Sequence, residues 1–566
     1  MMFLSSKEAS FFLIIFSLNM LWPSSTAIAF NSDSNFSIQM INEQTLLKSS
    51  ENVSYSLNLL YQNKYHNLSE VYEELQHFNK SAPEIVNYSY IGYSYYGNKI
   101  PLITLTNEKI SEEYKSKTYI VAHHHAREMC TIEIVIRIIR DLINEFGDNN
   151  DTTSLLNRVI IYFIVTLNPD SLDYTLYKNE HFRKSMKPYD DDNDGFLDED
   201  GPEDINEDGK ISEFWVYNAT TTDVITHWFE GYDRDMDGKI GEDPPGGVDL
   251  NRNYPFHWND STTDTGATSD KTSFTYPGPA PFSENESRVL DNFVKRYNFT
   301  HALSLHSGIA TLSYGWSWTN QYKQSEEDIY DAMAYYIHDK NLLPANFFPL
   351  DRIGYTSAGE WGDYMYSEYN IISMTLEIFG TADKSKLTLV SENTTHKIYE
   401  RKFEDFRAFN PLAKNLEDLH SDLFSFDKFW ISLTPKITLS SIINKTLPNG
   451  DKEISLYLES GSLYWNTTDN PKMRIISSDQ GLIKEYPPEI PVLLPNKDQK
   501  VKIILSPEIQ ENISLEIIIS SNWASDLIFS LKITLDMFKP VNGFIIIPSF
   551  LTLVLMVFQQ RKKRTR

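Results

Sequence analysis

The feature that most constrains this chain is the alternation of strand-like and helix-like segments between Tyr65 and about Ala413. Residues 158–167 (RVIIYFIVTL) are almost continuously apolar and end at Asn-Pro-Asp, which indicates a buried strand followed by a turn. Residues 118–122 form a second strand pattern, and apolar residues then recur at helical spacing from Ile132 to Leu142. Such alternation predicts an α/β domain with a mixed central sheet flanked by helices.

The length of 566 residues suggests two or three domains. Residues 30–60 are polar and predict a lead-in to the α/β domain, which we place at 61–425 with an acidic insertion at about 189–247. From 426 to 538, alternating runs such as KVKIILS and SLEIIIS lie among Pro, Asn and Gly turns. This pattern predicts a second domain, an all-β sandwich.

The two ends of the chain predict its location. Residues 1–29 contain an apolar run at 11–21 followed by Ala27-Ile28-Ala29, as in a signal peptide with its cleavage site. Residues 541–560 predict a single C-terminal transmembrane helix, and the basic tail at 561–566 predicts that this end faces the cytoplasm. Asn-x-Ser/Thr sites along the chain agree with glycosylation. We therefore expect a cell-membrane protein whose folded part is extracellular.

Charge and cysteine content exclude two classes of site. The 51 Lys and Arg residues against 78 Asp and Glu residues give a net charge of −27, which argues against nucleic acid as a partner. Cys130 is the single cysteine, so the chain forms no intrachain disulfide and no zinc site built on two or more cysteines. Its position in an apolar helix pattern predicts a buried, unreactive thiol.

His125-Ala126-Arg127-Glu128 is an H-x-x-E pair where a predicted strand passes into a predicted helix. This spacing lets an imidazole and a carboxylate converge on one cation. A second H-x-x-E pair, His227 and Glu230, lies in the acidic insertion. The first pair is the better candidate because it follows an apolar strand, although one such pair is weak evidence by itself.

The motifs that follow the first pair make it far more specific. They occur in this order: Asn168-Pro169-Asp170, Phe182-Arg183-Lys184, the run at 247–253 (GVDLNRN), Leu305-His306-Ser307, the run at 355–359 (YTSAG) and Thr375-Leu376-Glu377. The sequence over about 65–413 therefore resembles the zinc metallocarboxypeptidases of the carboxypeptidase A/T type. The resemblance implies that the domain at 61–425 is a zinc carboxypeptidase-like catalytic domain.

By this resemblance, His125, Glu128 and His306 are the ligands of one catalytic zinc ion, which leaves a fourth position for water. Glu377 matches the general base that accepts a proton from that water. Asp249 matches a carboxylate that orients the first zinc histidine.

The resemblance also implies a substrate site. Arg127 and Arg183 lie where the family places cations, and Arg127 matches the oxyanion stabiliser better because it lies inside the zinc motif. Arg183 fits either the oxyanion or the substrate. Asn251 and Arg252 match the pair that holds the terminal carboxylate, and Tyr355 matches the mobile tyrosine that covers the substrate.

Two features depart from the family pattern or leave it open. His123 and His124 stand where small residues are usual, and we expect them to be exposed. Glu360, Gly362 and Asp363 follow the tyrosine loop in the region that sets the side-chain pocket. A glycine leaves that pocket open, and either acid can attract a basic side chain, so mixed or basic specificity is weakly favoured.

The acidic insertion contains three copies of the D-x-[DN]-x-[DN]-G half of a calcium loop. The bidentate glutamate at position twelve is missing from each, and a solvated acidic loop is the alternative interpretation. The candidate calcium ligands are Asp190, Asp192, Asp194, Asp204, Asn206, Asp208, Asp233, Asp235 and Asp237.

Together these observations predict an outward-facing, membrane-anchored zinc carboxypeptidase that acts on peptide or protein C-termini. Two alternatives stay open. One is a related zinc hydrolase of cell-wall peptides or acylated amino acids. The other is a catalytically silent calcium-dependent binding protein, which the presence of Glu377 and Arg127 disfavours.

Overall fold

The structure is a computed structural model of the chain. It describes residues 30–32, 36–41 and 54–535, except for the following positions inside the last range: 113–114, 179–181, 191–194, 209–210, 235, 237, 239, 241–245, 322–326, 346, 348–354, 381–386, 403–404, 435–436, 461–470, 478, 492, 494–496, 508–512 and 521–526. The predicted signal peptide at 1–29 and the basic tail at 561–566 lie outside the described residues.

The predicted fold class needs one correction, which concerns the transmembrane helix at 541–560. No helix in the described part of the chain is long and apolar enough to cross a membrane. The segment 541–560 itself lies outside the described residues. The transmembrane helix is therefore no part of the fold that the structure describes.

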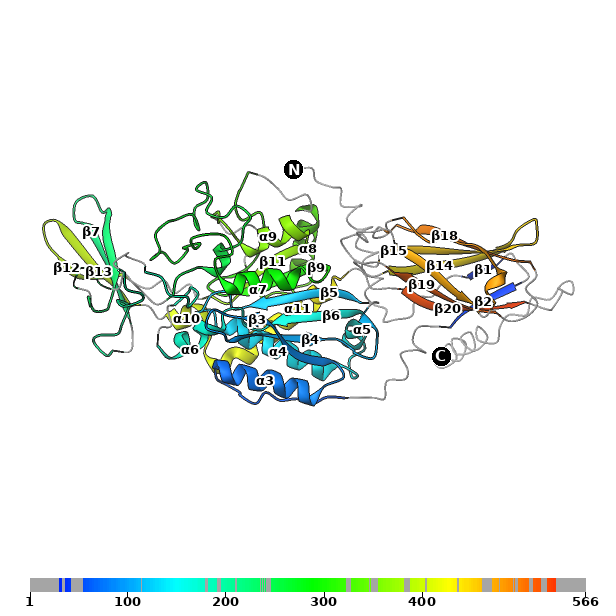
Figure 1. Ribbon diagram of the computed structural model, residues 1–566, viewed down its shortest axis with the longest axis horizontal. Coiled ribbons are helices and arrows are strands. Elements are labelled where there is room, and N and C mark those ends of the chain that lie inside the picture. The colour runs from blue at the N-terminus through cyan, green and yellow to red at the C-terminus, as the bar shows by residue number, and fades with distance from the viewer. Residues whose placement is uncertain are drawn as a thin grey trace, which may run out of the picture.

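A mixed seven-stranded sheet forms the centre of the α/β domain, which we define as residues 54–434 (Figure 1). The strand order is β10-β11-β9-β5-β6-β4-β3, and the four strands β11, β9, β5 and β6 run parallel. The bounds are β3 Val86–Tyr93, β4 Lys99–Leu105, β5 Ser116–Ala122, β6 Val159–Ile164, β9 Phe299–His306, β10 Ala310–Tyr314 and β11 Ile372–Ile378. The predicted mixed α/β sheet is thus present.

Both faces of the sheet are buried at its central strands, which explains why β6 is almost wholly apolar. Successive side chains of a strand point to opposite faces. In β5, Ile120 and Ala122 accordingly join one apolar cluster, whereas Tyr119 and Val121 join another. The first cluster includes residues of α3, α4, α5, α8 and α11, and the second includes residues of α7 and α9.

Two of the helices begin at residues whose sequence favours a helix start. Asn67 and Glu70 form a reciprocal capping box at the start of α3, and Pro169 occupies the first turn of α6. The helix bounds are α3 Leu68–Ser81, α4 Cys130–Glu145, α5 Asn150–Arg158, α6 Pro169–Tyr177, α7 Asn285–Val294, α8 Glu327–Asp339, α9 Trp361–Tyr369, α10 Asp405–Phe409 and α11 Leu416–Ser432, with short 3-10 turns η2 Leu250–Arg252, η3 Ala413–Asn415 and η4 Gln480–Leu482.

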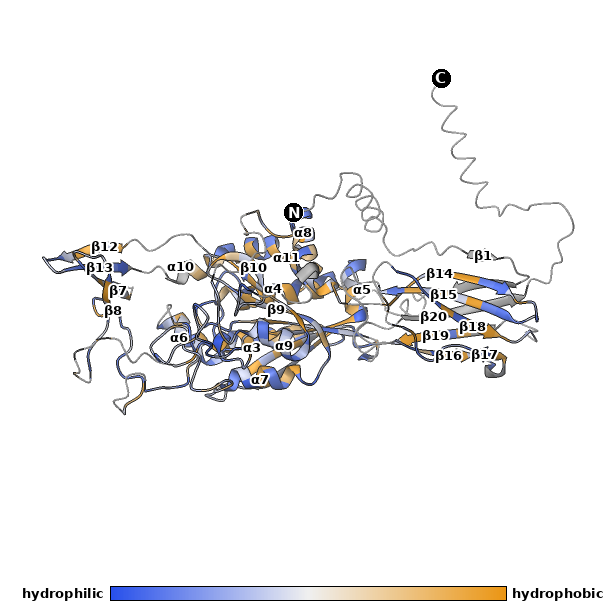
Figure 2. Cartoon of the chain, turned by 90° about the horizontal axis from the view of Figure 1, so that it is seen from above, coloured by the Kyte–Doolittle hydropathy of each residue, from blue (hydrophilic) through white to orange (hydrophobic). Residues whose placement is uncertain are grey.

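The acidic insertion contributes to a separate four-stranded sheet at one end of the α/β domain, as the views in Figures 1 and 2 agree. We call it the insertion sheet; its order is β12-β13-β7-β8. Its strands are β7 Ser212–Asn218, β8 Val224–Phe229, β12 Leu387–Glu392 and β13 His396–Lys402. Since β13 pairs with β7 from Ser212 to Asn218, the insertion is tied to a hairpin strand whose residues lie 178 to 190 positions after their partners.

Two sheets packed around one apolar cluster form the β-domain at the opposite end of the molecule (Figure 1). The sheets have the orders β1-β14-β15-β18-β17 and β16-β19-β20-β2. The bounds are β1 Phe30–Ser32, β2 Phe36–Ile41, β14 Ile437–Thr446, β15 Lys452–Ser460, β16 Lys472–Ser477, β17 Ile483–Glu485, β18 Gln499–Leu505, β19 Ile513–Ser520 and β20 Leu527–Leu535.

The structure differs from the predicted domain boundaries at two places. The lead-in predicted at 30–60 contains β1 and β2, which pair with β14 and β20 and so belong to the β-domain. The segment from 426 is not the start of the β-domain, because α11 continues to Ser432. Phe426 and Trp430 are buried in the core of the α/β domain, and this packing keeps the segment helical.

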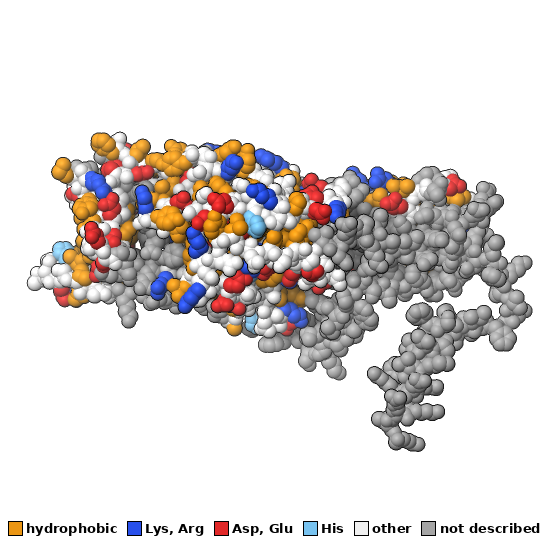
Figure 3. All heavy atoms as spheres, turned by 90° about the horizontal axis from the view of Figure 1, so that it is seen from below, with side chains coloured by type: hydrophobic (Ala, Val, Ile, Leu, Met, Phe, Trp, Pro, Cys, Tyr) orange, Lys and Arg blue, Asp and Glu red, His pale blue; other side chains and the backbone are white. Residues whose placement is uncertain are grey.

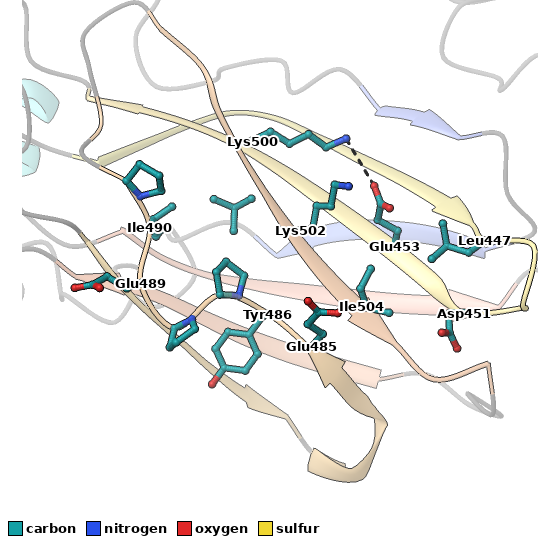
Figure 4. Close-up of a pocket in the computed structure, with 14 residues that line it drawn as sticks. Leu447, Asp451, Glu453, Glu485, Tyr486, Glu489, Ile490, Lys500, Lys502 and Ile504 are labelled. Carbon is teal, nitrogen blue, oxygen red and sulfur yellow. Dashed lines mark ion pairs between the residues drawn. The ribbon is translucent and has the colours of Figure 1, made fainter.

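The surface carries mixed charges on the α/β domain and a groove on the β-domain. Acidic and basic side chains are interspersed over the face of the α/β domain seen in Figure 3. A groove of about 770 Å³ lies in the β-domain, and Tyr486, Glu489 and Lys502 are among the residues that line it (Figure 4).

Candidate active site

Two neighbouring parallel strands bring the predicted metal ligands to one edge of the central sheet. The loop that carries His125 and Glu128 follows the end of β5 at Ala122, and His306 is the last residue of β9. Because β5 and β9 are parallel neighbours, both ligand sets lie at their carboxyl ends. In open α/β sheets this edge is where ligand sites form.

His125, Glu128 and His306 form a buried cluster whose ligand atoms all lie within 4.8 Å of one another. Glu128 Oε1 lies 2.7 Å from His125 Nδ1, and Glu128 Oε2 lies 2.9 Å from His306 Nδ1. The two Nδ1 atoms are 3.1 Å apart. Two imidazole nitrogens and a carboxylate turned toward one point form the donor set of a catalytic zinc site.

Asp249 fixes the orientation of the first of these ligands. Its Oδ1 atom lies 3.1 Å from His125 Nε2, so that nitrogen donates to the carboxylate and the lone pair of Nδ1 points to the cluster. Arg183 holds the other side of Asp249, with Nε and Nη2 each 3.0 Å from Oδ2. The residues present therefore fit a zinc ion.

Arg183, not Arg127, has its guanidinium against the metal ligands. Arg183 Nη1 lies 3.8 Å from Glu128 Oε1. The Arg127 guanidinium lies over the Phe409 ring at 4.1 Å and near the Phe274 ring at 5.6 Å. Burial lowers the pKa of Arg127 to about 9. The arrangement favours Arg183 over Arg127 as the cation nearest the reacting groups, contrary to the preference drawn from the sequence.

Residues 71–404, more than half of the chain, match the family model of the zinc carboxypeptidases. The chain belongs to this family. Its members are zinc-dependent hydrolases, which agrees with the zinc-type ligand cluster described above.

Several curated zinc carboxypeptidases are similar in sequence. Carboxypeptidase B2 of Rattus norvegicus is 25% identical over 329 residues, which are 57% of this chain and 64% of the relative. Carboxypeptidase B of Astacus astacus is 26% identical over 273 residues, which are 48% of this chain and 70% of the relative. The match thus spans less than two thirds of the rat protein, and 55% and 54% of its bovine and human counterparts.

Solved structures also match part of this chain, at low identity. The crystal structure of thrombin activatable fibrinolysis inhibitor has a TM-score of 0.47 and 18% identity, with 69% of this chain and 80% of that chain covered. Carboxypeptidase A from Helicoverpa armigera has a TM-score of 0.45 and 18% identity, with 69% and 76% covered.

Glu377 of β11 lies next to the zinc ligands of this carboxypeptidase fold. It is the Cα partner of His306 on β9. Burial, together with the nearby carboxylate of Glu128, raises the pKa of Glu377 well above its ordinary value. Among the described residues, no hydrogen-bond partner faces the buried Oε2 atom of Glu377.

The residues predicted to hold a terminal carboxylate lie together around the start of α9. Asn251 Oδ1 accepts a hydrogen bond of 3.0 Å from the Trp361 N–H. Arg252 is buried, and its Nη1 atom lies 3.2 Å from Glu360 Oε1. Tyr355 is 43% exposed and interacts electrostatically with Arg252, Arg183 and Glu377. Tyr355 thus links the residues predicted to bind the terminal carboxylate to Arg183 and Glu377, which lie beside the zinc ligands.

The three residues considered for specificity have different environments. Glu360 pairs with Arg252 and lines a small cavity beside Tyr355. Asp363 is buried and accepts hydrogen bonds from the Ser317 and Trp318 N–H groups, so its carboxylate serves the backbone. A Cβ atom added at Gly362 would meet only Ser373 Oγ, at 3.9 Å, which leaves open space there.

His123 and His124 are buried, and the expectation that they are exposed is wrong. His123 spans Thr166 Oγ1 at 2.9 Å and the Ala126 carbonyl at 2.8 Å, and burial lowers its pKa to about 4. His124 stacks on the ring of His306, with a centroid distance of 5.2 Å. Both histidines therefore shape the loop that carries the zinc ligands.

Asn410, which no sequence pattern singles out, binds the backbone of the same loop. Its side-chain amide donates to the Arg127 carbonyl at 2.8 Å, and its Oδ1 atom accepts from the Cys130 N–H at 2.8 Å. Cys130 is buried as expected, and burial raises the pKa of its thiol. No local motif marks Asn410, since its partners lie about 280 positions earlier in the chain.

Of the candidate calcium ligands, Asp192, Asp194, Asp235 and Asp237 lie outside the described residues. Asp190 Oδ2 and Asp233 Oδ2 each accept a hydrogen bond from the glycine N–H five positions later, at 3.1 Å. Asp204 Oδ1 and Asn206 Oδ1 both accept from the Asp208 N–H. The described ligand candidates therefore form tight loops, each closed on its own backbone.

Proposed function

We propose that this chain is a zinc-dependent carboxypeptidase that hydrolyses the C-terminal peptide bond of peptides or proteins. One observation carries the proposal: a buried His-Glu-His cluster lies at the same sheet edge as Glu377 and an Arg–Asn pair. The family membership supports the reaction class, and the cationic pair supports a substrate with a free carboxylate.

In this proposal each side chain has one task. His125, Glu128 and His306 would hold a zinc ion, which would supply Lewis-acid activation of water and of the scissile carbonyl. Glu377 accepts a proton from the attacking water and passes it to the leaving amine. Arg183 faces the negative charge that develops on the carbonyl oxygen, a task for which its position beside Glu128 suits it.

The other residues hold the end of the substrate. Arg252 and the side-chain amide of Asn251 bind the terminal carboxylate, with Asn251 oriented by its bond to the Trp361 N–H. Tyr355, exposed in part and close to both arginines, closes over the bound residue. A peptide bond one residue from the carboxylate then lies against the zinc cluster.

The test compares two peptides that differ only at their ends. Zinc-loaded protein is incubated with a peptide that has a free C-terminal carboxylate and with the same peptide amidated. We expect single-residue losses by mass spectrometry from the free acid and at least about 100-fold slower loss from the amide, because the amide cannot pair with Arg252. Equal cleavage of both would contradict the proposal. No cleavage of either would favour the cell-wall substrates or the silent binding role instead.

Calcium binding by the insertion is a further part of the proposal. The hydrogen bonds that Asp190 and Asp233 accept from the Gly195 and Gly238 N–H groups support it, as does the finding that Asp190 Oδ1 and Asp233 Oδ1 are buried with no hydrogen-bond partner among the described residues. The test is a calcium titration of the metal-free protein followed by thermal unfolding. A saturable rise in Tm with calcium supports the site. No rise in Tm, or only a weak rise that magnesium gives equally, favours a solvated acidic loop.

We also propose that the enzyme acts outside the cell, where calcium is available. The Asn-x-Ser/Thr sites support this location.

A further inference from the structure

A small cavity beside Tyr355 contains a single charged side chain among the described residues that line it. The lining includes Ser313, Trp316, Ser317, Ser357 and Glu360. Tyr355 forms one wall, so the cavity lies where the side chain of the substrate's last residue would enter. The character of Glu360 therefore decides which side chain this cavity accepts.

The Glu360 carboxylate does not cap the helix that it precedes. Glu360 is the N-cap residue of α9, but its side chain makes no capping hydrogen bond, and Asn251 Oδ1 accepts from the Trp361 N–H in its place. The preceding Gly359 has a φ of 62°, and a Cβ atom there would lie 2.3 Å from the Arg252 carbonyl oxygen. This close approach of the two chain segments places the Glu360 carboxylate beside the Arg252 guanidinium.

Glu360 and Arg252 form an almost buried ion pair. Glu360 Oε1 lies 3.2 Å from Arg252 Nη1, and the two side chains are 13% and 4% exposed. If Arg252 takes the carboxylate of a substrate, one guanidinium faces two carboxylates in a poorly hydrated site. A buried charge without a partner is costly, so the bound complex gains from a second cation near Glu360.

We propose that Glu360 is a specificity-determining residue that selects peptides whose last residue is a lysine or an arginine. This inference rests on the proposed function. The substrate carboxylate replaces Glu360 on Arg252, and the cationic side chain of the same residue then pairs with Glu360. Two ion pairs thus form from one, and the charge of the site stays balanced.

Asp363, the other acid of this segment, does not take part in this exchange. It is 1% exposed, and both of its oxygens accept from the Ser317 N–H, each at 2.9 Å. Its carboxylate holds the loop that forms the cavity wall. Selection for a cation therefore depends on Glu360.

The first readout is binding, which does not depend on turnover. Two peptides that differ only in a C-terminal arginine or its neutral isostere citrulline are titrated calorimetrically into the zinc-loaded Glu377→Gln protein. We expect the arginine peptide to bind at least about tenfold more tightly. With Glu360→Gln added, the ratio should fall to within about twofold. With Glu368→Gln, an exposed acid on the same helix, the ratio should persist.

The second readout is kcat/KM of the wild-type protein for the same peptide pair. Equal binding of the arginine and citrulline peptides to the parent protein overturns the inference, and so does a ratio that survives Glu360→Gln. Should the Glu360→Gln protein fail to fold, the parent comparison decides alone. Hydrolysis of neither peptide, with the binding preference present, refutes the peptidase and leaves the cation selection standing.

Discussion

Glu377 and His306 are Cα partners on the parallel strands β11 and β9. The sheet register therefore places a carboxylate of raised pKa directly beside a zinc-type ligand. Because the two residues belong to packed strands of one sheet, their separation is held by backbone hydrogen bonds and not by a loop. A proton acceptor positioned in this way needs little rearrangement before reaction.

Zinc content provides the first prediction. We expect the wild-type protein to bind about one zinc ion per chain and the His125→Ala and His306→Ala proteins to lose it, because each variant leaves only two ligands. Plasma mass spectrometry of dialysed protein measures this. His227→Ala, which alters the exposed histidine of the second H-x-x-E pair, serves as the matched control and should keep its zinc. Loss of zinc in the control protein alone would mean that the zinc ion binds in the insertion.

Asp249 should tune zinc affinity without being a ligand. Replacing it by asparagine weakens the hydrogen bond that orients His125 and removes the ion pair with Arg183. Loss of such a partner typically lowers metal affinity by about 10- to 100-fold. Competition with a chromophoric chelator gives the affinity. An unchanged value in the Asp249→Asn protein would show that His125 is oriented by its backbone alone.

The two arginines of the site are predicted to differ in their effect on catalysis. We expect Arg183→Met to lower kcat by about 100- to 1,000-fold, because it removes a cation 3.8 Å from Glu128. Arg127→Met keeps a stem over the Phe409 ring and should lower kcat less. Steady-state kinetics on one peptide compares them. The opposite order would restore Arg127 as the cation that faces the reacting oxygen.

A buried histidine far from the zinc cluster should make stability depend on pH. Although burial alone lowers the pKa of His66, the carboxylates of Glu133 and Glu74 raise it to about 9. His66 Nδ1 lies 2.8 Å from Glu133 Oε1. Because the folded-state pKa exceeds the unfolded value, the stabilisation is fully present below about pH 6.5 and is lost as the pH rises through 9.

The difference between the folded and unfolded pKa of His66 sets the size of its effect on stability. The free energy of unfolding of the wild-type protein should exceed that of His66→Gln by about 3 kcal/mol near pH 6. The excess should shrink steadily toward pH 10. Urea unfolding at a series of pH values measures both proteins. A constant difference across this range would mean that His66 is neutral in the fold.

The sequence predicts the zinc ligands and the mixed sheet because their signals are local. His125 and Glu128 share one motif after an apolar strand, and His306 ends another such strand. Apolar runs at 118–122 and 158–167 likewise mark β5 and β6. Such patterns predict the structure because a buried strand needs apolar side chains along its length.

Other parts of the site depend on contacts that no local pattern reveals. Three consecutive histidines look hydrophilic, yet His123 is buried because Thr166 and the Ala126 carbonyl satisfy both ring nitrogens. Glu360 finds Arg252 across 108 positions of sequence. The lead-in strands β1 and β2 become strands only by pairing with β14, some 410 positions later, and with β20, some 490 to 500 positions later.

The most direct test of the central claim compares zinc-loaded wild-type protein with zinc-loaded Glu377→Gln at equal metal content. The measured quantity is the rate at which each releases the last residue of a peptide with a free carboxylate. We predict that the glutamine protein keeps its zinc and its peptide affinity but loses about 100- to 10,000-fold in kcat. A variant that retains most of the wild-type rate would contradict the assignment of Glu377 as the proton acceptor and, with it, the proposed mechanism.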